Sequence, residues 1–193
     1  MAKYRVDFET VWSSTTHPAE FPATAHFSGL IGATHQRGVA LFEVGEIASL
    51  GIKDMAERGT KVALLTEIVI LQSQGQTEFT LSGAGVSPSP GQTSLEFDIT
   101  LTHPLVTITT MIAPSPDWFL AVSGVDLTSN GTWVNELEVE AIAYDAGTDS
   151  GLTFSSSNQI TNPFEPIFKI VTPPLAVDGE VATMGTFRFV RIK

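Results

Sequence analysis

The sequence predicts a mainly β protein, an antiparallel β-sandwich with a short helical insertion. Apolar and polar residues alternate in several short segments, as they do in strands that bury one face against a core. Glycine, proline and asparagine recur between these segments as turn signals. Only residues 52–73 depart from this pattern, with apolar residues at helical spacing. About seven to nine strands within 193 residues fit a single domain over residues 1–193.

The N-terminal third predicts two strands separated by a loop. Tyr4–Trp12 carries an apolar residue at every second position and is expected to form a half-buried strand. Ser13–Thr34 contains two X-Pro pairs and two glycines, which favour a loop. Val39–Val44 is a short apolar run and is predicted to be the second strand.

The insertion is expected to hold two helical segments. Ile52–Glu57 can form about one and a half turns before Gly59. A longer helix is expected over Lys61–Ser73, with Thr60 as its N-cap and Gly75 closing its end. The β-branched residues in the middle of the longer segment also suit a strand, which is the alternative there.

Everything after Gly75 is typical of strands. Thr93–Leu101 alternates throughout, which predicts exposed Glu96 and Asp98 and a buried set comprising Leu95, Phe97, Ile99 and Leu101. His103-Pro104 predicts a tight turn and Asn130-Gly131 a hairpin turn, while Ser155–Pro166 is polar enough for a surface loop. The further strands predicted here are Val106–Ile112, Trp118–Val122, Trp133–Tyr144 and Thr186–Ile192.

The charge distribution argues against several partners. The chain has 21 acidic and 10 basic residues and a formal net charge of −11. No Lys or Arg lies between Val62 and Phe168, whereas acidic residues continue through this stretch. Nucleic acids require clustered Lys and Arg, so we expect no nucleic-acid partner. Anionic membranes have the same requirement, so membrane binding would need calcium as a bridge.

Motifs for catalysis are absent, and no catalytic residue is assigned. The sequence lacks the nucleophile elbow, the phosphate-binding loop and the zinc-protease motif. Without cysteine it forms no disulfide and no thiolate site. The histidines are expected to bond loop backbone, with a zinc site from distant histidines as the alternative. The acidic row Glu136, Glu138 and Glu140 is interpreted as a solvated strand face rather than as part of a glycosidase acid pair.

The candidate site is a metal site on the loop that follows the Trp133–Tyr144 strand. Asp145 and Asp149 lie four residues apart on this glycine-containing loop. Antiparallel pairing with the strand that begins at Trp118 would place Asp117 beside them. Three carboxylates in a stretch without Lys or Arg call for a cation, and ligands that are all oxygen favour calcium. Trp118 is interpreted as packing, with a ligand-binding role as the alternative.

A family resemblance rests on the stretches Ala25-His26-Phe27-Ser28, Ile31-Gly32-Ala33-Thr34-His35, Gly51-Ile52-Lys53-Asp54-Met55-Ala56-Glu57, Pro114-Ser115-Pro116-Asp117-Trp118 and Tyr144-Asp145-Ala146-Gly147-Thr148-Asp149-Ser150-Gly151. With these stretches the chain, from about Tyr4 to Pro166, resembles the spondin domain, the N-terminal module of F-spondin and mindin that also occurs in bacterial secreted proteins. Animal members carry disulfides, so this cysteine-free chain is interpreted as a bacterial-type member. The resemblance implies a C2-like β-sandwich with one bound calcium on Asp117, Asp145 and Asp149.

The function expected from these observations is that of a secreted, calcium-binding, non-catalytic module for extracellular matrix or cell-surface adhesion. Its partner would be an extracellular protein or glycan. The sequence starts with a strand-like segment and not with a signal peptide, so we expect the leader to be absent from it. The alternatives are a structural or assembly subunit that self-associates through an edge strand or the Ser155–Pro166 loop, a hydrolase, and a calcium-dependent membrane binder.

Overall fold

The alternating N-terminal segment forms a central strand of the first sheet. In the computed structural model, which describes residues 1–193, β1 (Ala2–Thr10) buries Tyr4, Val6 and Phe8 as predicted. Both neighbours of β1 run antiparallel to it. The first sheet has the order β10-β15-β1-β5 and adds β10 (Glu136–Glu140), β15 (Gly185–Arg191) and β5 (Gly91–Ile99).

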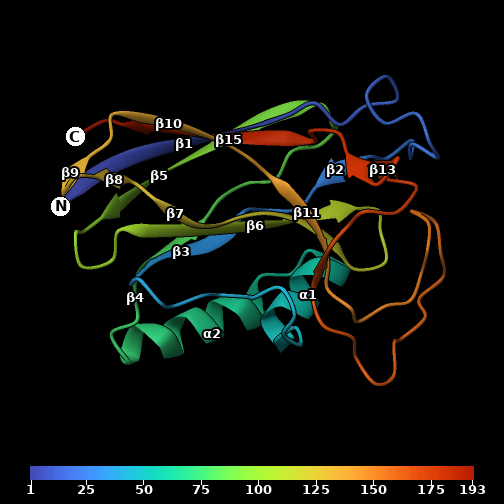
Figure 1. Cartoon of the computed structure of the whole chain (residues 1–193), viewed down its shortest axis with the longest axis horizontal. Coiled ribbons are helices and arrows are strands. Elements are labelled where there is room, and N and C mark those ends of the chain that lie inside the picture. The colour runs from blue at the N-terminus through green and yellow to red at the C-terminus, as the bar shows by residue number, and fades with distance from the viewer.

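A second antiparallel sheet packs against the first, which confirms the predicted β-sandwich (Figure 1). Its order is β12-β11-β7-β6-β3-β4, and β2 pairs with β6. The strands are β2 (His26–Phe27), β3 (Ile31–His35), β4 (Thr77–Ser82), β6 (Leu105–Ala113), β7 (Trp118–Asp126), β11 (Ile142–Asp145) and β12 (Phe168–Lys169). Two small hairpins complete the fold, β8 (Thr128–Ser129) with β9 (Thr132–Trp133) and β13 (Ala176–Val177) with β14 (Glu180–Val181).

The protein has two apolar cores, one on each side of the second sheet. The core between the sheets contains stacked aromatic side chains, such as Phe8 and Phe187 with ring centroids 4.5 Å apart. The other core lies between the second sheet and the helices, which cover its lower face in Figure 1. For this reason β6 is buried on both faces, including its threonines. A strand buried on both sides loses the simple alternation of a solvent-facing strand.

The predicted insertion forms two helices, α1 (Leu50–Arg58) and α2 (Val62–Ser73). Gly59 closes α1 with a φ of 64°, and Gly75 follows α2 with a φ of 72°, as their positions predict. The assignment of Thr60 as the N-cap of α2 is wrong. Its backbone N–H instead donates to Asp54 O (3.4 Å), so Thr60 belongs to the end of α1. Lys61 takes the N-cap position without a side-chain hydrogen bond to the helix.

Several strand boundaries differ from the prediction. Val39–Val44 is not a strand, since its apolar residues Leu41 and Phe42 fill the helix-side core from a loop. The predicted Trp133–Tyr144 strand is broken twice. Trp133 belongs to β9, and at Ala141 the chain crosses from β10 in the first sheet to β11 in the second. Leu101 lies in a turn after β5 and is 56% exposed.

The predicted alternation of β5 is confirmed at three positions, since Phe97 and Ile99 are buried and Glu96 is exposed. Leu95, predicted to be buried, and Asp98, predicted to be exposed, are both half-buried. The Asn130-Gly131 turn is confirmed, and it joins the short strands β8 and β9. The turn predicted at His103-Pro104 lies instead at Leu101-Thr102, closed by a hydrogen bond from the His103 N–H to Thr100 O (3.1 Å), and it leads from the first sheet to the second.

The predicted loop Ser13–Thr34 is wrong at His26–Phe27, which forms β2, and over its last residues, which form β3 between β6 and β4 in the second sheet. Gly32, interpreted as a loop residue, lies where an added Cβ would come within 1.9 Å of the carbonyl oxygen of Thr107 on β6. Glycine therefore permits the close approach of two strands at this point. The remainder of the segment has little regular structure, as expected.

Ser49 provides a test of the helical insertion. Its Oγ accepts a hydrogen bond from the backbone N–H of Ile52 (3.2 Å) and donates one to Glu67 of α2 (2.7 Å). We expect Ser49→Ala to lower the free energy of unfolding by about 1 kcal/mol, because an N-cap bond is lost. Urea titration should show this change, whereas Thr66→Ala on the exposed face of α2 should stay within about 0.5 kcal/mol of the wild type. Equal losses in both variants would contradict the capping role of Ser49.

Candidate functional site

The candidate site lies where β7 begins and β11 ends, at one end of the second sheet. The two strands pair antiparallel with Trp118 opposite Asp145, as predicted. The backbone N–H of Ala146 donates to the carbonyl oxygen of Asp117 (3.1 Å), which extends the pairing by one step. The geometry therefore places Asp117 beside the loop that carries Asp145 and Asp149.

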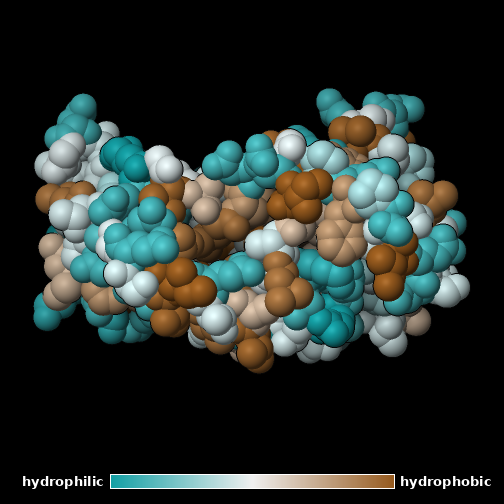
Figure 2. All heavy atoms as spheres, turned by 90° about the horizontal axis from the view of Figure 1, so that it is seen from below, coloured by the Kyte–Doolittle hydropathy of each residue, from teal (hydrophilic) through white to brown (hydrophobic).

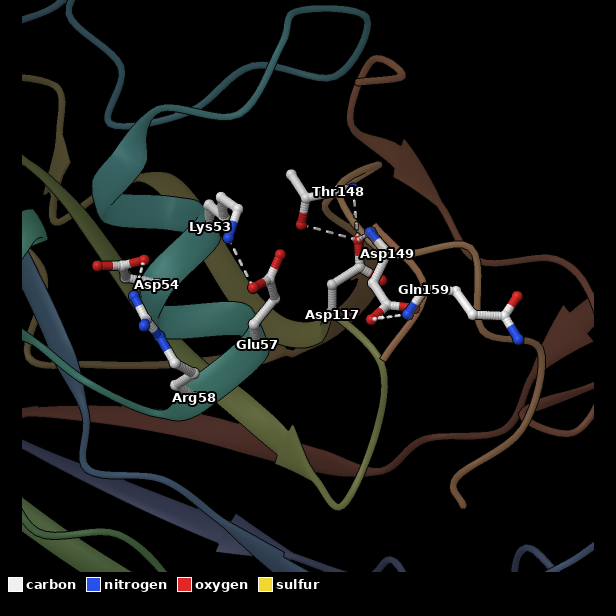
Figure 3. A network of polar contacts seen from close by, with 8 residues as sticks. All are labelled: Lys53, Asp54, Glu57, Arg58, Asp117, Thr148, Asp149 and Gln159. Carbon is white, nitrogen blue, oxygen red and sulfur yellow. Dashed lines mark hydrogen bonds and ion pairs between the residues drawn. The ribbon is translucent and has the colours of Figure 1, made fainter. Parts of the chain in front are cut away.

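Asp117 is completely buried and holds the loop by one of its two carboxylate oxygens. Its Oδ2 accepts hydrogen bonds from the backbone N–H groups of Thr148 (2.7 Å) and Asp149 (3.0 Å) and from the Thr148 hydroxyl (3.2 Å) (Figure 3). Its Oδ1 has no hydrogen-bond partner although it is buried. A buried carboxylate oxygen without a donor is costly, so this atom calls for a ligand or a proton.

Asp145 is held between the loop and the adjacent strand. Its Oδ1 accepts from the backbone N–H of Gly147 (2.8 Å), and its Oδ2 accepts from the indole N–H of Trp118 (3.0 Å). Gly147 has a φ of 72°, and an added Cβ would come within 2.1 Å of the carbonyl oxygen of Glu165. Only glycine satisfies both the left-handed backbone and this close contact.

Asp149 connects the loop to the chain that returns past it. Its Oδ1 accepts from the backbone N–H of Gly151 (2.8 Å), and its Oδ2 accepts from the backbone N–H of Gln159 (3.1 Å). Asp149 also pairs with Ile160 in an isolated β-bridge. Both of its carboxylate oxygens therefore organise the chain from Gly151 onward, which includes the predicted surface loop Ser155–Pro166.

Burial and a neighbouring carboxylate raise the pKa of two of the aspartates, Asp145 and Asp117. Burial raises the pKa of Asp145 to about 7, and the charge of Asp117 adds to this shift. Burial also raises the pKa of Asp117, against the hydrogen bonds from the loop, and the charge of Asp149 adds to the rise. Neither shift is offset by a basic side chain in direct contact with Asp117 or Asp145.

Basic residues do come near the site from α1, which the charge pattern of the sequence did not reveal. Lys53 and Arg58 line a cleft of ≈ 400 Å³ together with Asp149. Each is paired with an acid of its own helix, Lys53 with Glu57 at 2.7 Å and Arg58 with Asp54 (Figure 3). The i, i+4 spacing of these pairs was the available sequence signal, but it did not indicate where the helix would lie.

The oxygen atoms of the three aspartates are of the kind that a hard cation requires. Asp117 Oδ1 has no donor, and a carboxylate oxygen that accepts one hydrogen bond keeps a further lone pair. Each side chain is nevertheless turned toward backbone or indole donors, and no three acidic or histidine side chains converge as a preformed metal cluster. The donor chemistry fits calcium, and the carboxylates would have to adjust to surround one ion.

Two neighbouring expectations are confirmed. Trp118 is buried and packs edge-on against Phe154, with the two ring centroids 5.3 Å apart. This is the packing role that the sequence analysis assigned to it. The histidines are structural, since a ring nitrogen of each lies within hydrogen-bond distance of a backbone carbonyl oxygen. The pairs are His17 with Ala182, His26 with Thr24, His35 with Gln36 and His103 with Gly75.

Fold and site together define a two-sheet antiparallel β-sandwich with buried carboxylates on the loops at one end. Residues 2–177 match the family model described as Spondin_N, and the chain belongs to this family. Spondin-2 from Rattus norvegicus and from Homo sapiens are each 37% identical to it, over 88% and 89% of this chain. Spondin-1 from Homo sapiens is 38% identical over 86% of this chain.

The matched region is only part of these relatives. It covers 53% of either Spondin-2 and 21% of Spondin-1, so the chain spans about half of their length or less. The spondins are secreted extracellular proteins, and membership of their family places this chain among extracellular modules. None of its helices has the length and apolar character needed to cross a membrane.

Proposed function

We propose that the chain is a secreted, calcium-binding, non-catalytic module for extracellular matrix or cell-surface adhesion. The observation that carries the calcium proposal is the buried Oδ1 of Asp117, which lacks any hydrogen-bond donor. Asp145, with its pKa raised to about 7, supports it, because a buried carboxylate that is hard to ionise gains from a cation nearby. Membership of the spondin family supports the adhesion role.

Asp117, Asp145 and Asp149 are the proposed calcium ligands. When bound, calcium would supply the positive charge that these carboxylates lack. Asp117 already links the start of β7 to Thr148 and Asp149, and Asp149 links the loop to Gln159. These contacts tie together three segments distant in sequence, so the site can order the loops at this end of the sandwich.

The adhesion proposal requires an extracellular protein or glycan that the module binds. We expect the immobilised chain to retain a matrix protein or glycan from an array in millimolar calcium. Retention should fall in chelator and in the variant Asp117→Asn, because bound calcium would then no longer fix the loops at this end of the sandwich. An array without a single retained ligand would contradict the adhesion proposal. The calcium site would still be tested separately, by the effect of calcium on the stability of the chain.

The alternative is an assembly subunit, and the outer face of α2 favours it. This helix buries only Leu64 and Ile68, while Val62, Val69 and Ile70 are more than half exposed. Figure 2 shows the helical side of the molecule, where apolar residues lie at the surface among hydrophilic ones. A second copy would suit this uncharged face on an otherwise acidic chain. Sedimentation velocity decides between the proposals, because assembly through α2 would produce a concentration-dependent dimer that Val69→Glu dissociates.

A further inference from the structure

The strand β10 has one open side. It is the last strand of the first sheet, next to β15. Hydrogen bonds from Arg191 N–H to Asn135 O (2.8 Å) and from Ala141 N–H to Gly185 O (3.0 Å) show that its odd-numbered residues bond to β15. Strand geometry then directs the backbone N–H and C=O groups of the even-numbered residues to the open side. These residues are Glu136, Glu138 and Glu140.

The two faces of this edge differ in chemistry. The three glutamates form an exposed row on the outer face, whereas Leu137 and Val139 pack toward the core. Below the edge, between the two sheets, lies a cleft of ≈ 320 Å³ with a mainly apolar lining. Its apolar residues include Leu120, Val139, Ala141, Ala143, Val181 and Met184, and Glu140 and Lys169 are its charged members.

The strand already paired with β10, on its closed side, shows which side chains match the two faces of β10. β15 places Arg188 directly opposite Glu138, between Phe187 and Phe189, which are both fully buried. The Nε of Arg188 lies 2.8 Å from a carboxylate oxygen of Glu136. The partner strand therefore presents a basic residue on the outer face and apolar residues on the inner face.

We propose that the open edge of β10 binds an extended peptide of alternating basic and apolar residues as an added strand. The backbone groups of Glu136, Glu138 and Glu140 would continue the sheet, and the glutamate row would pair with the basic side chains. The apolar side chains of the peptide would enter the cleft between the sheets. This site is separate from the aspartate loop and does not depend on calcium.

A second copy of the same edge does not fit this surface. Two β10 strands paired side by side would bring glutamates opposite glutamates, and like charges directly opposite destabilise a strand pair. The formal net charge of −11 likewise attracts a basic segment to this acidic edge.

The experiment uses a fluorescent N-acetylated octapeptide of alternating arginine and valine, with anisotropy as the readout. We expect saturable binding that is unchanged by chelator. The same peptide with glutamate for arginine, or with every backbone amide methylated, should not bind. Glu138→Gln with Glu140→Gln should weaken binding about three- to tenfold, because two cross-strand ion pairs are lost.

A proline variant separates backbone pairing from charge. Glu138→Pro removes an N–H that faces the open side, where an edge strand tolerates proline, and should abolish binding beyond the effect of Glu138→Gln. Circular dichroism checks that the variant is folded. Failure of the basic peptide to bind, or equal binding of the acidic or methylated peptide, would overturn the proposal. A dimer of the free protein that Glu138→Pro dissociates would overturn it as well, because a second copy would then occupy the edge.

Discussion

In chelator, the free energy of unfolding should increase as the pH falls from about 7 toward 4, because folded Asp145 retains a proton that the unfolded chain releases. Burial and then the charge of Asp117 raise the pKa of Asp145 to about 7. An unfolded aspartate has a pKa near 3.9, so the folded state binds more protons between these two values. The stabilisation is complete below the unfolded pKa and is lost as the pH rises through about 7. A shift of this size corresponds to about 4 kcal/mol at most.

Urea titrations at several pH values would measure this effect, with Asp145→Asn as the control. The control is needed because His17 and His35 act in the opposite direction. Burial lowers the pKa of both histidines, so acid favours their unfolded, protonated forms. Asp117 acts in the same direction as Asp145, since burial raises its pKa too. An identical pH dependence in the wild type and in Asp145→Asn would contradict the assignment.

Asp117→Asn should abolish the response to calcium without destabilising the protein in chelator. The amide oxygen of asparagine can accept the loop hydrogen bonds that Asp117 Oδ2 accepts, and the amide nitrogen would occupy the place of the oxygen without a donor. Removal of the charge also relieves repulsion with Asp145. Differential scanning fluorimetry in chelator and in calcium measures both effects. A full calcium response in Asp117→Asn would contradict its role as a ligand.

Asp149→Asn serves as the matched comparison, because the two aspartates differ in their donors. Both oxygens of Asp149 accept backbone N–H groups, from Gly151 and from Gln159. An asparagine there must direct its NH₂ group toward one of these donors and leave it unsatisfied. We expect a loss of about 1–3 kcal/mol in chelator, which Asp117→Asn does not show. Equal stability of the two variants would show that the hydrogen bonds of Asp149 contribute little.

The sequence predicted features that depend on local pattern. Alternation identified β1 and the buried face of β5, because each has one face toward solvent. The proximity of Asp117 and Asp145 followed from the pairing of two strands, and the register of Trp118 with Asp145 confirms it. Gly59 and Gly75 marked helix ends because their left-handed backbone suits glycine.

Features that depend on tertiary packing were not predicted. Gly32 was interpreted as a loop residue. The close approach of β6, which requires glycine at this position, exists only in the folded sheet. Nothing in the local sequence marks the division at Ala141. The segment resembles one strand with alternating residues, but β10 and β11 pair within different sheets. The position of Lys53 near Asp149 likewise depends on how α1 packs against the sheet. The sequence therefore overstated how free the aspartates are of basic neighbours.

Thermal unfolding with and without calcium tests the central claim most directly. A ligand at a hundredfold excess over its Kd stabilises the folded state by about 2.7 kcal/mol. For a domain of this size the expected rise in Tm is about 5–11 °C between chelator and saturating calcium. Magnesium should raise it less, because it demands compact octahedral geometry and gives up its water reluctantly. A Tm that is the same in chelator and in millimolar calcium would contradict a calcium site at Asp117, Asp145 and Asp149.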